Sequence, residues 1–239
     1  MHISSKLRMK WFVDNYVSKI NKNKIKILDV GSYDFNGSYR DIFVGEKYEY
    51  IGMDMEEGPN VDLVLKNPYD WAEISTESYD VIISGQTFEH TEFFWITMAE
   101  MTRALKKDGL LCIIVPNKWP EHRYPVDCYR FFTDGMIALA RYVSLEVLHA
   151  DTDCAPKSAN WSAGDWYHGR LTESMLVAKK TYSGETKYAD LKTYKCVTLD
   201  QEIFRNGLIP HKYKKETLRD FFKKILPKKL RILIRKTLK

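Results

Sequence analysis

The sequence lacks the features that define several classes of protein. It contains no run of about 18 apolar residues, so it predicts no transmembrane helix. Residues 1–10 contain no apolar segment of the kind found in secretory signals. The four cysteines (Cys112, Cys128, Cys154 and Cys196) form no C-x-x-C pair, which excludes the common zinc-binding patterns. These absences predict a cytoplasmic protein with reduced cysteines.

Charge is distributed unevenly along the chain. The 239 residues carry a net charge of +5. Residues 212–239 contain twelve Lys or Arg and two acidic residues, whereas residues 1–211 contain 25 basic and 30 acidic residues. The body is therefore mildly acidic and the C-terminal end strongly basic, so we expect an anionic partner to meet that end.

The basic end, residues 214–239, is also amphipathic. Its apolar residues recur at helical spacing on both sides of Pro227, with lysines and arginines elsewhere. This pattern is typical of a helix on an anionic membrane, which would place the protein peripherally on the inner face of the membrane. A helix packed on the domain with a solvated basic face is an almost equally good explanation, and nucleic acid is the least favoured partner. The apolar positions are Leu218, Phe221, Phe222, Ile225, Leu226, Leu230, Leu233, Ile234 and Leu238.

Strand-like and helix-like segments alternate through residues 1–180, which we interpret as one domain followed by a connecting segment at 181–213. The pattern predicts helices over 5–20, 93–105 and 134–142, with Gly109 as the stop signal of the second. Such alternation predicts an α/β fold with a mostly parallel, doubly wound sheet, whose ligands bind at the carboxyl ends of the strands. The predicted strands are 25–30, 48–53, 61–65, 79–84, 110–115, 144–150 and 174–178.

The first strand ends in a loop suited to a ligand. The apolar run 25–30 stops at Gly31, where the missing side chain lets a ligand approach the backbone. Asp29 is a carboxylate in a buried strand and should be paired or directed at a polar group. Asp54 follows Gly31 by 23 residues, which suits a carboxylate accepting hydrogen bonds from ribose hydroxyls. The loop has no G-x-G-x-x-G motif, which argues against a dinucleotide.

Five short motifs appear in an order that resembles the class I S-adenosylmethionine-dependent methyltransferases. They are LDVGS (28–32), GMD (52–54), YDVIIS (79–84), EH (89–90) and LKKDGLL (105–111). The resemblance covers residues 25–116 and implies a Rossmann-like fold, with a seven-stranded, mostly parallel sheet flanked by helices. It also implies S-adenosylmethionine as cofactor.

The resemblance implies which residues hold the cofactor. Asp29 would accept from its amino group, Asp54 would hold the ribose diol, and Asn67 would reach the adenine edge. The structural alternatives are a buried capping residue for Asp29 and an ordinary turn residue for Asp54. The full set that we expect is Asp29, Gly31, Ser32, Asn36, Gly37, Asp54, Met55, Asn67, Gly85 and Gln86.

A histidine after the fourth strand is the first candidate for a catalytic base. His90 titrates near neutral pH and follows a strand that faces the acceptor in the resembling enzymes. Holding the loop is an equally good explanation of this residue. No Asp, Glu and His spacing in the sequence predicts a metal site.

The segment 122–131 is the second candidate, because it mixes charged and aromatic residues without the periodicity of a core. We expect His122 or Asp127 to act as base, and Tyr124 and Arg130 to bind substrate. An Asp127–Arg130 pair that only stiffens the loop is slightly favoured for those two residues. A second aromatic loop would complete the acceptor wall through Trp161 and His168.

Together these features predict an O-methyltransferase that uses a His/Asp base and acts on a sugar or glycan, free or linked to a lipid or nucleotide. Aromatic faces beside hydrogen-bonding charges suit a sugar ring. Similar loops occur in methyltransferases resembling those that act on saccharides and cell-surface polymers. A small metabolite or a phosphorylated group, gripped by an arginine, is the alternative acceptor. A second alternative is a relative that binds the cofactor or a partner without catalysis.

Overall fold

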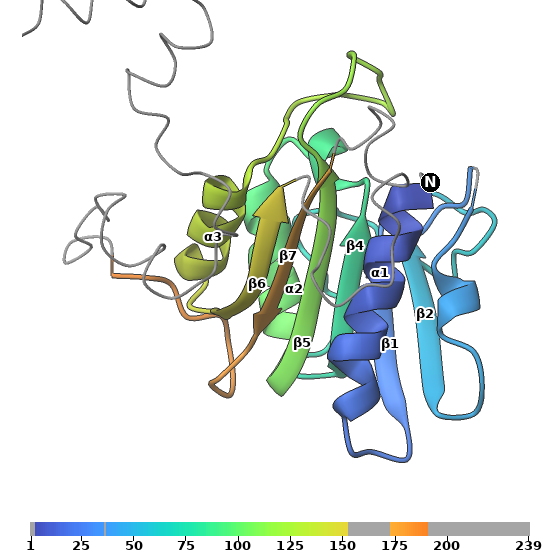
Figure 1. Cartoon of the computed structure of the whole chain (residues 1–239), viewed down its shortest axis with the longest axis vertical. Helices are drawn as coiled ribbons and strands as arrows, with labels where there is room; N and C mark the ends of the chain where they lie inside the picture. Colours follow the sequence, from blue (N-terminus) through green and yellow to red (C-terminus); the bar gives the residue numbers. More distant parts are fainter. Residues whose placement is uncertain (1–2, 36, 153–172, 191–239) are drawn as a thin grey trace, which may run out of the picture. The chain divides into compact units, whose positions relative to one another are not determined.

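A seven-stranded sheet forms the centre of the protein (Figure 1). The structure, a computed structural model, describes residues 3–35, 37–152 and 173–190. The strand order is β3-β2-β1-β4-β5-β7-β6, and every neighbouring pair is parallel except the two that involve β7. This confirms the predicted Rossmann-like α/β fold. The strands are β1 (Ile25–Val30), β2 (Tyr48–Asp54), β3 (Leu63–Val64), β4 (Tyr79–Gly85), β5 (Leu105–Pro116), β6 (Glu146–Thr152) and β7 (Glu173–Lys179).

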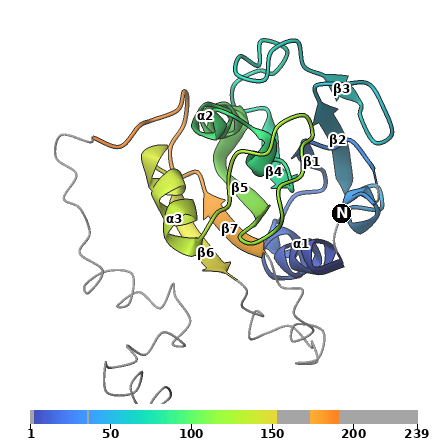
Figure 2. The same cartoon turned by 90° about the horizontal axis from the view of Figure 1, so that it is seen from above.

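Helices cover both faces of the sheet. Seen from above, α1 (Ile3–Asn15) lies on one face, and α2 (Phe94–Ala104) and α3 (Thr133–Tyr142) lie on the other (Figure 2). Side chains of a strand alternate between the two faces, so each buried strand supplies apolar residues to both layers. Under α1, Phe12 belongs to one buried cluster with Ile27 of β1 and Ile83 of β4.

A buried ion pair links α1 to β6 and β7, the two strands at one end of the strand order. Arg8 is fully buried, and its Nη1 lies 2.5 Å from Oδ1 of Asp151 in β6. Its Nε lies 3.7 Å from Oε2 of Glu173 in β7. Because removing one member of such a pair would strand a buried charge, this contact holds the register of α1 against β6 and β7.

Two predicted helix boundaries are wrong. The first helix, predicted over 5–20, ends at Asn15 and is followed by a 3-10 turn, Val17–Lys19. The second helix was expected to run to Leu105 and stop at Gly109, but α2 ends at Ala104 and β5 begins at Leu105. Leu105 pairs with Tyr79 of β4, and the backbone N–H of Asp108 donates to the carbonyl oxygen of Lys180 at 2.7 Å. Pairing with neighbours on both sides therefore draws residues 105–109 into the sheet, against the local glycine signal.

The carboxyl ends of β1, β2, β4 and β5 lie at one edge of the sheet, as parallel pairing requires. Seen from above, the segment that joins β5 to α3, residues 117–132, arches across the ends of β4 and β1 (Figure 2). Among the described residues, no helix has both the length and the apolar character needed to cross a bilayer. The predicted tail at 214–239 lies outside the described residues.

Candidate functional site

The loops after β1 and β4 meet at a glycine. Gly31 follows β1 with φ of +79°, and its N–H donates to the carbonyl oxygen of Met53 at 2.9 Å. A Cβ at this position would lie 2.1 Å from Oγ1 of Thr87, in the loop after β4. Only a residue without a side chain therefore allows the two loops to pack this closely.

Asp54 closes the second strand beside this contact. Its Oδ2 accepts a hydrogen bond from the N–H of Tyr33 at 2.9 Å, and its Oδ1 accepts one from the N–H of Met55 at 2.7 Å. Each carboxylate oxygen can accept more than one hydrogen bond, so Asp54 retains capacity for a ligand. The same bonds tie the end of β2 to the loop after β1.

A small pocket of about 80 Å³ opens between Asp54 and Gly31. It is apolar over most of its wall, with the carboxylate at one side, and so suits a flat, largely apolar ring joined to a hydroxylated group. Its lining is Val30, Gly31, Met53, Asp54, Met55, Leu65, Pro68, Trp71, Thr87, Thr91 and Thr97.

Asp29 is a buried acid with spare hydrogen-bonding capacity. It is 3% exposed, and its Oδ2 accepts from the hydroxyl of Tyr50, while its Oδ1 has no hydrogen-bond partner within residues 3–35, 37–152 and 173–190. Burial raises the pKa of Asp29 to about 7, with the Tyr50 hydrogen bond acting in the opposite direction. An oxygen left in this state can accept from a ligand's N–H group, which fits the amino group of the predicted cofactor.

The other predicted cofactor residues lie in several environments. Ser32 is buried and donates to the carbonyl oxygen of Asn60 at 3.1 Å. Gly37 lines a separate polar cavity of about 750 Å³ with Lys6, Arg40 and Asp62. Ser32 and Gly37 do not line the small pocket, whereas Gly31 and Asp54 do.

The predicted residues near the ends of β3 and β4 make contacts within the protein itself. Oδ1 of Asn67 accepts from the N–H of Tyr69 at 2.9 Å, a turn within its own loop. Gly85 packs against Tyr39, whose hydroxyl would lie 2.0 Å from a Cβ there. Gln86 has φ of +59° and donates to Oε1 of Glu173 at 3.2 Å. Asn36 lies outside the described residues.

His90 is held in a defined tautomer. Its Nδ1 lies 2.6 Å from the carbonyl oxygen of Val126. A carbonyl oxygen only accepts, so Nδ1 carries the proton and Nε2 presents a lone pair when the ring is neutral. Burial lowers the pKa of His90, while the hydrogen bond to Val126 acts in the opposite direction, and the net shift favours the neutral ring at pH 7.

Glu89 and His122 lie beside this imidazole. Oε1 of Glu89 is 3.8 Å from Nε2 of His90, and the two histidine rings meet edge to face with centroids 4.9 Å apart. Glu89 is 1% exposed, and burial raises the pKa of its carboxyl to about 8. The three side chains offer donor atoms within 4.8 Å of one another.

Asp127 and Arg130 form a bidentate ion pair, as the structural alternative for these residues predicted. Nη1 and Nη2 of Arg130 lie 2.5 Å and 2.8 Å from the two oxygens of Asp127. Arg130 also donates to the carbonyl oxygens of Trp119, Pro120 and Tyr129. The hydrogen bonds from Arg130 hold the pKa of Asp127 well below its usual range, which makes this carboxylate a weak base.

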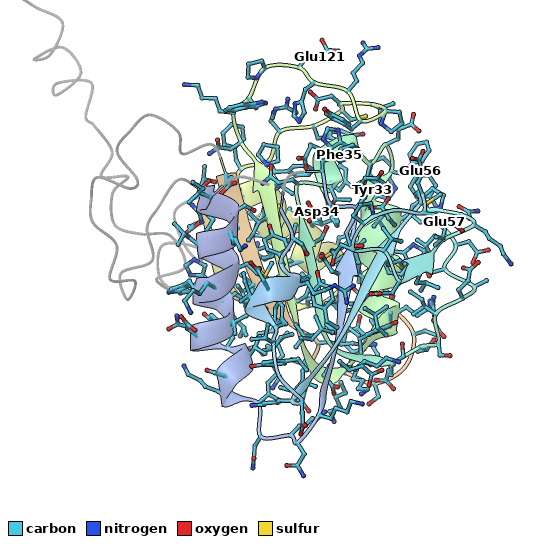
Figure 3. All side chains as sticks on the ribbon, turned by 90° about the vertical axis from the view of Figure 1, so that its right-hand side faces the viewer. Tyr33, Asp34, Phe35, Glu56, Glu57 and Glu121 are labelled. Carbon is cyan, nitrogen blue, oxygen red and sulfur yellow. The ribbon has the colours of Figure 1, made fainter. Side chains whose placement is uncertain are left out.

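Aromatic side chains link the arching segment to the first loop. Tyr33 stacks on Phe35, and Phe35 meets Tyr124 with ring centroids 5.2 Å apart. Phe35 and Tyr124 are 70% and 58% exposed, so they leave ring faces open to a ligand. Figure 3 shows Tyr33 and Phe35 below the segment that carries Glu121. The predicted acceptor residues Trp161 and His168 lie outside the described residues.

The residues predicted from the sequence do not include Thr87, Trp71 and Leu65, which line the small pocket. Thr87, which packs on Gly31, has no motif of its own. Trp71 and Leu65 line the small pocket from the region after β3, where only Asn67 was proposed. A tryptophan in the connection between β3 and β4 was the available signal for that wall.

Comparisons with known proteins agree with this geometry. Residues 29–113 match the family model described as a methyltransferase domain. Comparison with curated proteins finds no match. A CurJ carbon methyltransferase superposes with a TM-score of 0.55 at 12% identity, covering 74% of this chain and 54% of the other, so the chain spans about half of that one's length.

For two further solved structures, the match covers most of the other chain. A 1,6-didemethyltoxoflavin-N1-methyltransferase from Burkholderia thailandensis, bound to S-adenosylhomocysteine, gives a TM-score of 0.55 at 14% identity, covering 75% of this chain and 80% of the other. An S-adenosylmethionine-dependent methyltransferase from Mesorhizobium loti gives 0.51 at 13% identity, covering 73% and 95%. At these identities the structures establish the fold. With the domain match over residues 29–113, they support a methyltransferase domain that uses S-adenosylmethionine as methyl donor.

The bare backbone at Gly31 gives the first test of this site. We expect Gly31→Ala to weaken S-adenosylhomocysteine binding about tenfold or more, because the new methyl group meets Thr87 and separates the two loops. Gly45→Ala is the matched control, since Gly45 also has a positive φ, of +99°, but nothing lies within 4 Å of its Cβ position. Isothermal titration calorimetry measures both affinities. Equal affinities in Gly31→Ala and the wild type would contradict the assignment.

Proposed function

We propose that this protein is an S-adenosylmethionine-dependent methyltransferase, that it transfers the methyl group to a hydroxyl of a saccharide, and that His90 is the general base. The observation that carries the proposal is the hydrogen bond between Nδ1 of His90 and Val126. It fixes the tautomer of the neutral imidazole, so that Nε2 carries the lone pair at the carboxyl edge of the sheet. A hydroxyl is a poor nucleophile while protonated, so it needs such a base more than an amine or a thiolate does.

The chain's residues would divide the work between cofactor and acceptor. Asp54 would hold the ribose hydroxyls, Asp29 would accept from the amino group, and the pocket around Trp71 would receive the adenine. S-adenosylmethionine, when bound, supplies an electrophilic methyl group on its sulfonium. His90 would take the acceptor's proton at Nε2 as the oxygen attacks, and holding the two reactants in line supplies much of the rate.

Two further observations favour a saccharide among hydroxyl acceptors. Tyr124 lies beside His90, with ring centroids 6.0 Å apart, and the exposed ring of Phe35 packs against Tyr124. A sugar ring offers C–H faces that pack on such aromatic rings. Arg130 already donates to Asp127 and to three carbonyl oxygens, which weakens the case for the phosphorylated acceptor that this arginine suggested. A small metabolite and a non-catalytic cofactor-binding role remain the alternatives that an acceptor screen with labelled cofactor separates.

Loss of the base should slow the reaction without weakening cofactor binding. We expect His90→Ala to lower turnover about 100-fold or more and to leave S-adenosylhomocysteine affinity unchanged. His122→Ala tests the neighbouring imidazole as the alternative base. In the wild type, kcat/KM should fall as the pH drops through the lowered pKa of His90, because the protonated ring cannot accept a proton. Wild-type turnover in both variants would contradict a histidine base.

We also propose that residues 214–239 bind an anionic membrane, because their sequence combines an apolar stripe with a strongly basic face. A membrane location suits a lipid-linked glycan acceptor.

Deletion of residues 214–239 tests this part. We expect the truncated protein to lose binding to vesicles that contain phosphatidylglycerol and to keep its affinity for S-adenosylhomocysteine. Vesicle flotation and calorimetry measure the two properties. Unchanged flotation of the truncated protein would show that the tail is not a membrane anchor.

A further inference from the structure

We propose that Glu89 and His90 bind two neighbouring hydroxyls of the acceptor, so that the enzyme recognises a vicinal diol and methylates the hydroxyl on His90. This inference rests on the proposed function, because it needs an acceptor with hydroxyl groups. It assigns Glu89 as an acceptor-binding residue and adds a rule for which hydroxyl is methylated.

The first observation is a buried carboxyl without a partner. Both carboxyl oxygens of Glu89 are buried and make no hydrogen bond among the described residues. A buried polar group in this state is unfavourable in the free protein and calls for an explanation. The rise in the pKa of Glu89 has the same origin, since burial is its largest cause.

The second observation is how firmly the backbone of Glu89 is held. Its carbonyl oxygen accepts from the N–H of Cys128 at 2.7 Å, which joins the end of β4 to the arching segment. The residue also lies in a 3-10 turn, Phe88–His90, whose last N–H donates to the carbonyl oxygen of Thr87 at 2.9 Å. The backbone of Glu89 is therefore fixed at the carboxyl edge of the sheet, beside His90.

The charges nearby do not neutralise this carboxyl. Asp127 and Glu173 both raise its pKa, and the cation that lowers it, Arg130, directs hydrogen bonds to Asp127 and to main-chain carbonyls. The surroundings of Glu89 therefore favour a neutral hydrogen-bonding group of the acceptor, such as a hydroxyl.

The spacing of the pair indicates two donors rather than one. Oε1 of Glu89 and Nε2 of His90 are 3.8 Å apart, too far to hydrogen-bond each other. A single hydroxyl has one proton and can donate to only one of them. Hydroxyls on adjacent carbons, each donating at about 2.8 Å, can satisfy both, because their own separation is comparable to that of the two acceptor atoms.

The position of the base then determines which oxygen is methylated. The O–H bond beside His90 breaks, its proton moves to Nε2, and the oxygen's electron pair forms the new O–CH₃ bond as the sulfonium C–S bond breaks. The hydroxyl on Glu89 keeps its proton and positions the ring. An acceptor whose neighbouring hydroxyl is missing or already methylated should therefore bind poorly.

The test compares Glu89→Leu and Glu89→Gln with Glu92→Gln, a change to an exposed glutamate three residues away. The probes are methyl glycosides of common hexoses and 6-deoxyhexoses and their monodeoxy derivatives, with labelled S-adenosylmethionine. We expect Glu89→Leu to raise the acceptor KM about tenfold or more with a smaller change in kcat, Glu89→Gln to do so less, and Glu92→Gln to match the wild type.

Two further readouts separate acceptor binding from a structural role. Glu89→Leu should not lower the melting temperature or the affinity for S-adenosylhomocysteine, because it removes an unpaired buried carboxyl. The wild type should discriminate about tenfold against the probe that lacks the hydroxyl next to the methylated one, and Glu89→Leu should lose this discrimination.

Each other outcome counts against the inference. An unchanged acceptor KM in Glu89→Leu, while saccharides are still methylated, would overturn it and leave the proposed function intact. Methylation of amines alone, or of no probe, would overturn both. A stoichiometric divalent metal in the purified protein that is lost in Glu89→Leu would instead make Glu89, His90 and His122 a metal site.

Discussion

The contact between Thr87 and Gly31 is the constraint on which the rest of the site depends. It brings the loop after β4 onto the loop after β1, closer than any side chain at residue 31 would allow. Asp54, at the end of β2, is hydrogen-bonded to the loop after β1 through Tyr33, and the Glu89-His90 turn directly continues the loop after β4. Donor and acceptor chemistry can therefore share one edge of the sheet because one position has no Cβ.

Burial without full compensation is shared by two of the proposed site residues at this edge. Arg8 is paired with Asp151, and Asp127 is paired with Arg130. Asp29 and Glu89 each keep at least one buried oxygen that has no hydrogen-bond partner among the described residues. Such oxygens reduce stability in the free protein, and a ligand that donates to them recovers the loss on binding. In the sequence, Asp29 precedes Gly31 by two residues, and Glu89 follows Thr87 by two residues.

Much of this arrangement could be predicted from the sequence, because it follows from strand order. Gly31 and Asp54 each end a strand, and parallel pairing places both at the same edge. The stop of α2 was misplaced because Gly109 is a local signal, whereas pairing with β4 and β7 decides that region.

Other features depend on contacts between distant segments. The sequence left Arg130 between substrate binding and an ion pair, and only the folded segment shows where its donors are directed. Likewise, nothing local reveals that Glu89 lacks a partner. The fold also does not determine which acceptor atom is methylated, since similar structures include a carbon methyltransferase and an N1-methyltransferase.

The most direct test of the account is a crystal structure of the protein with S-adenosylhomocysteine. The account predicts the ribose at Asp54, the adenine in the pocket with Trp71, and the sulfur facing Nε2 of His90 across a space that also reaches Glu89. A cofactor bound elsewhere, or a sulfur turned away from the Glu89-His90 turn, would contradict it.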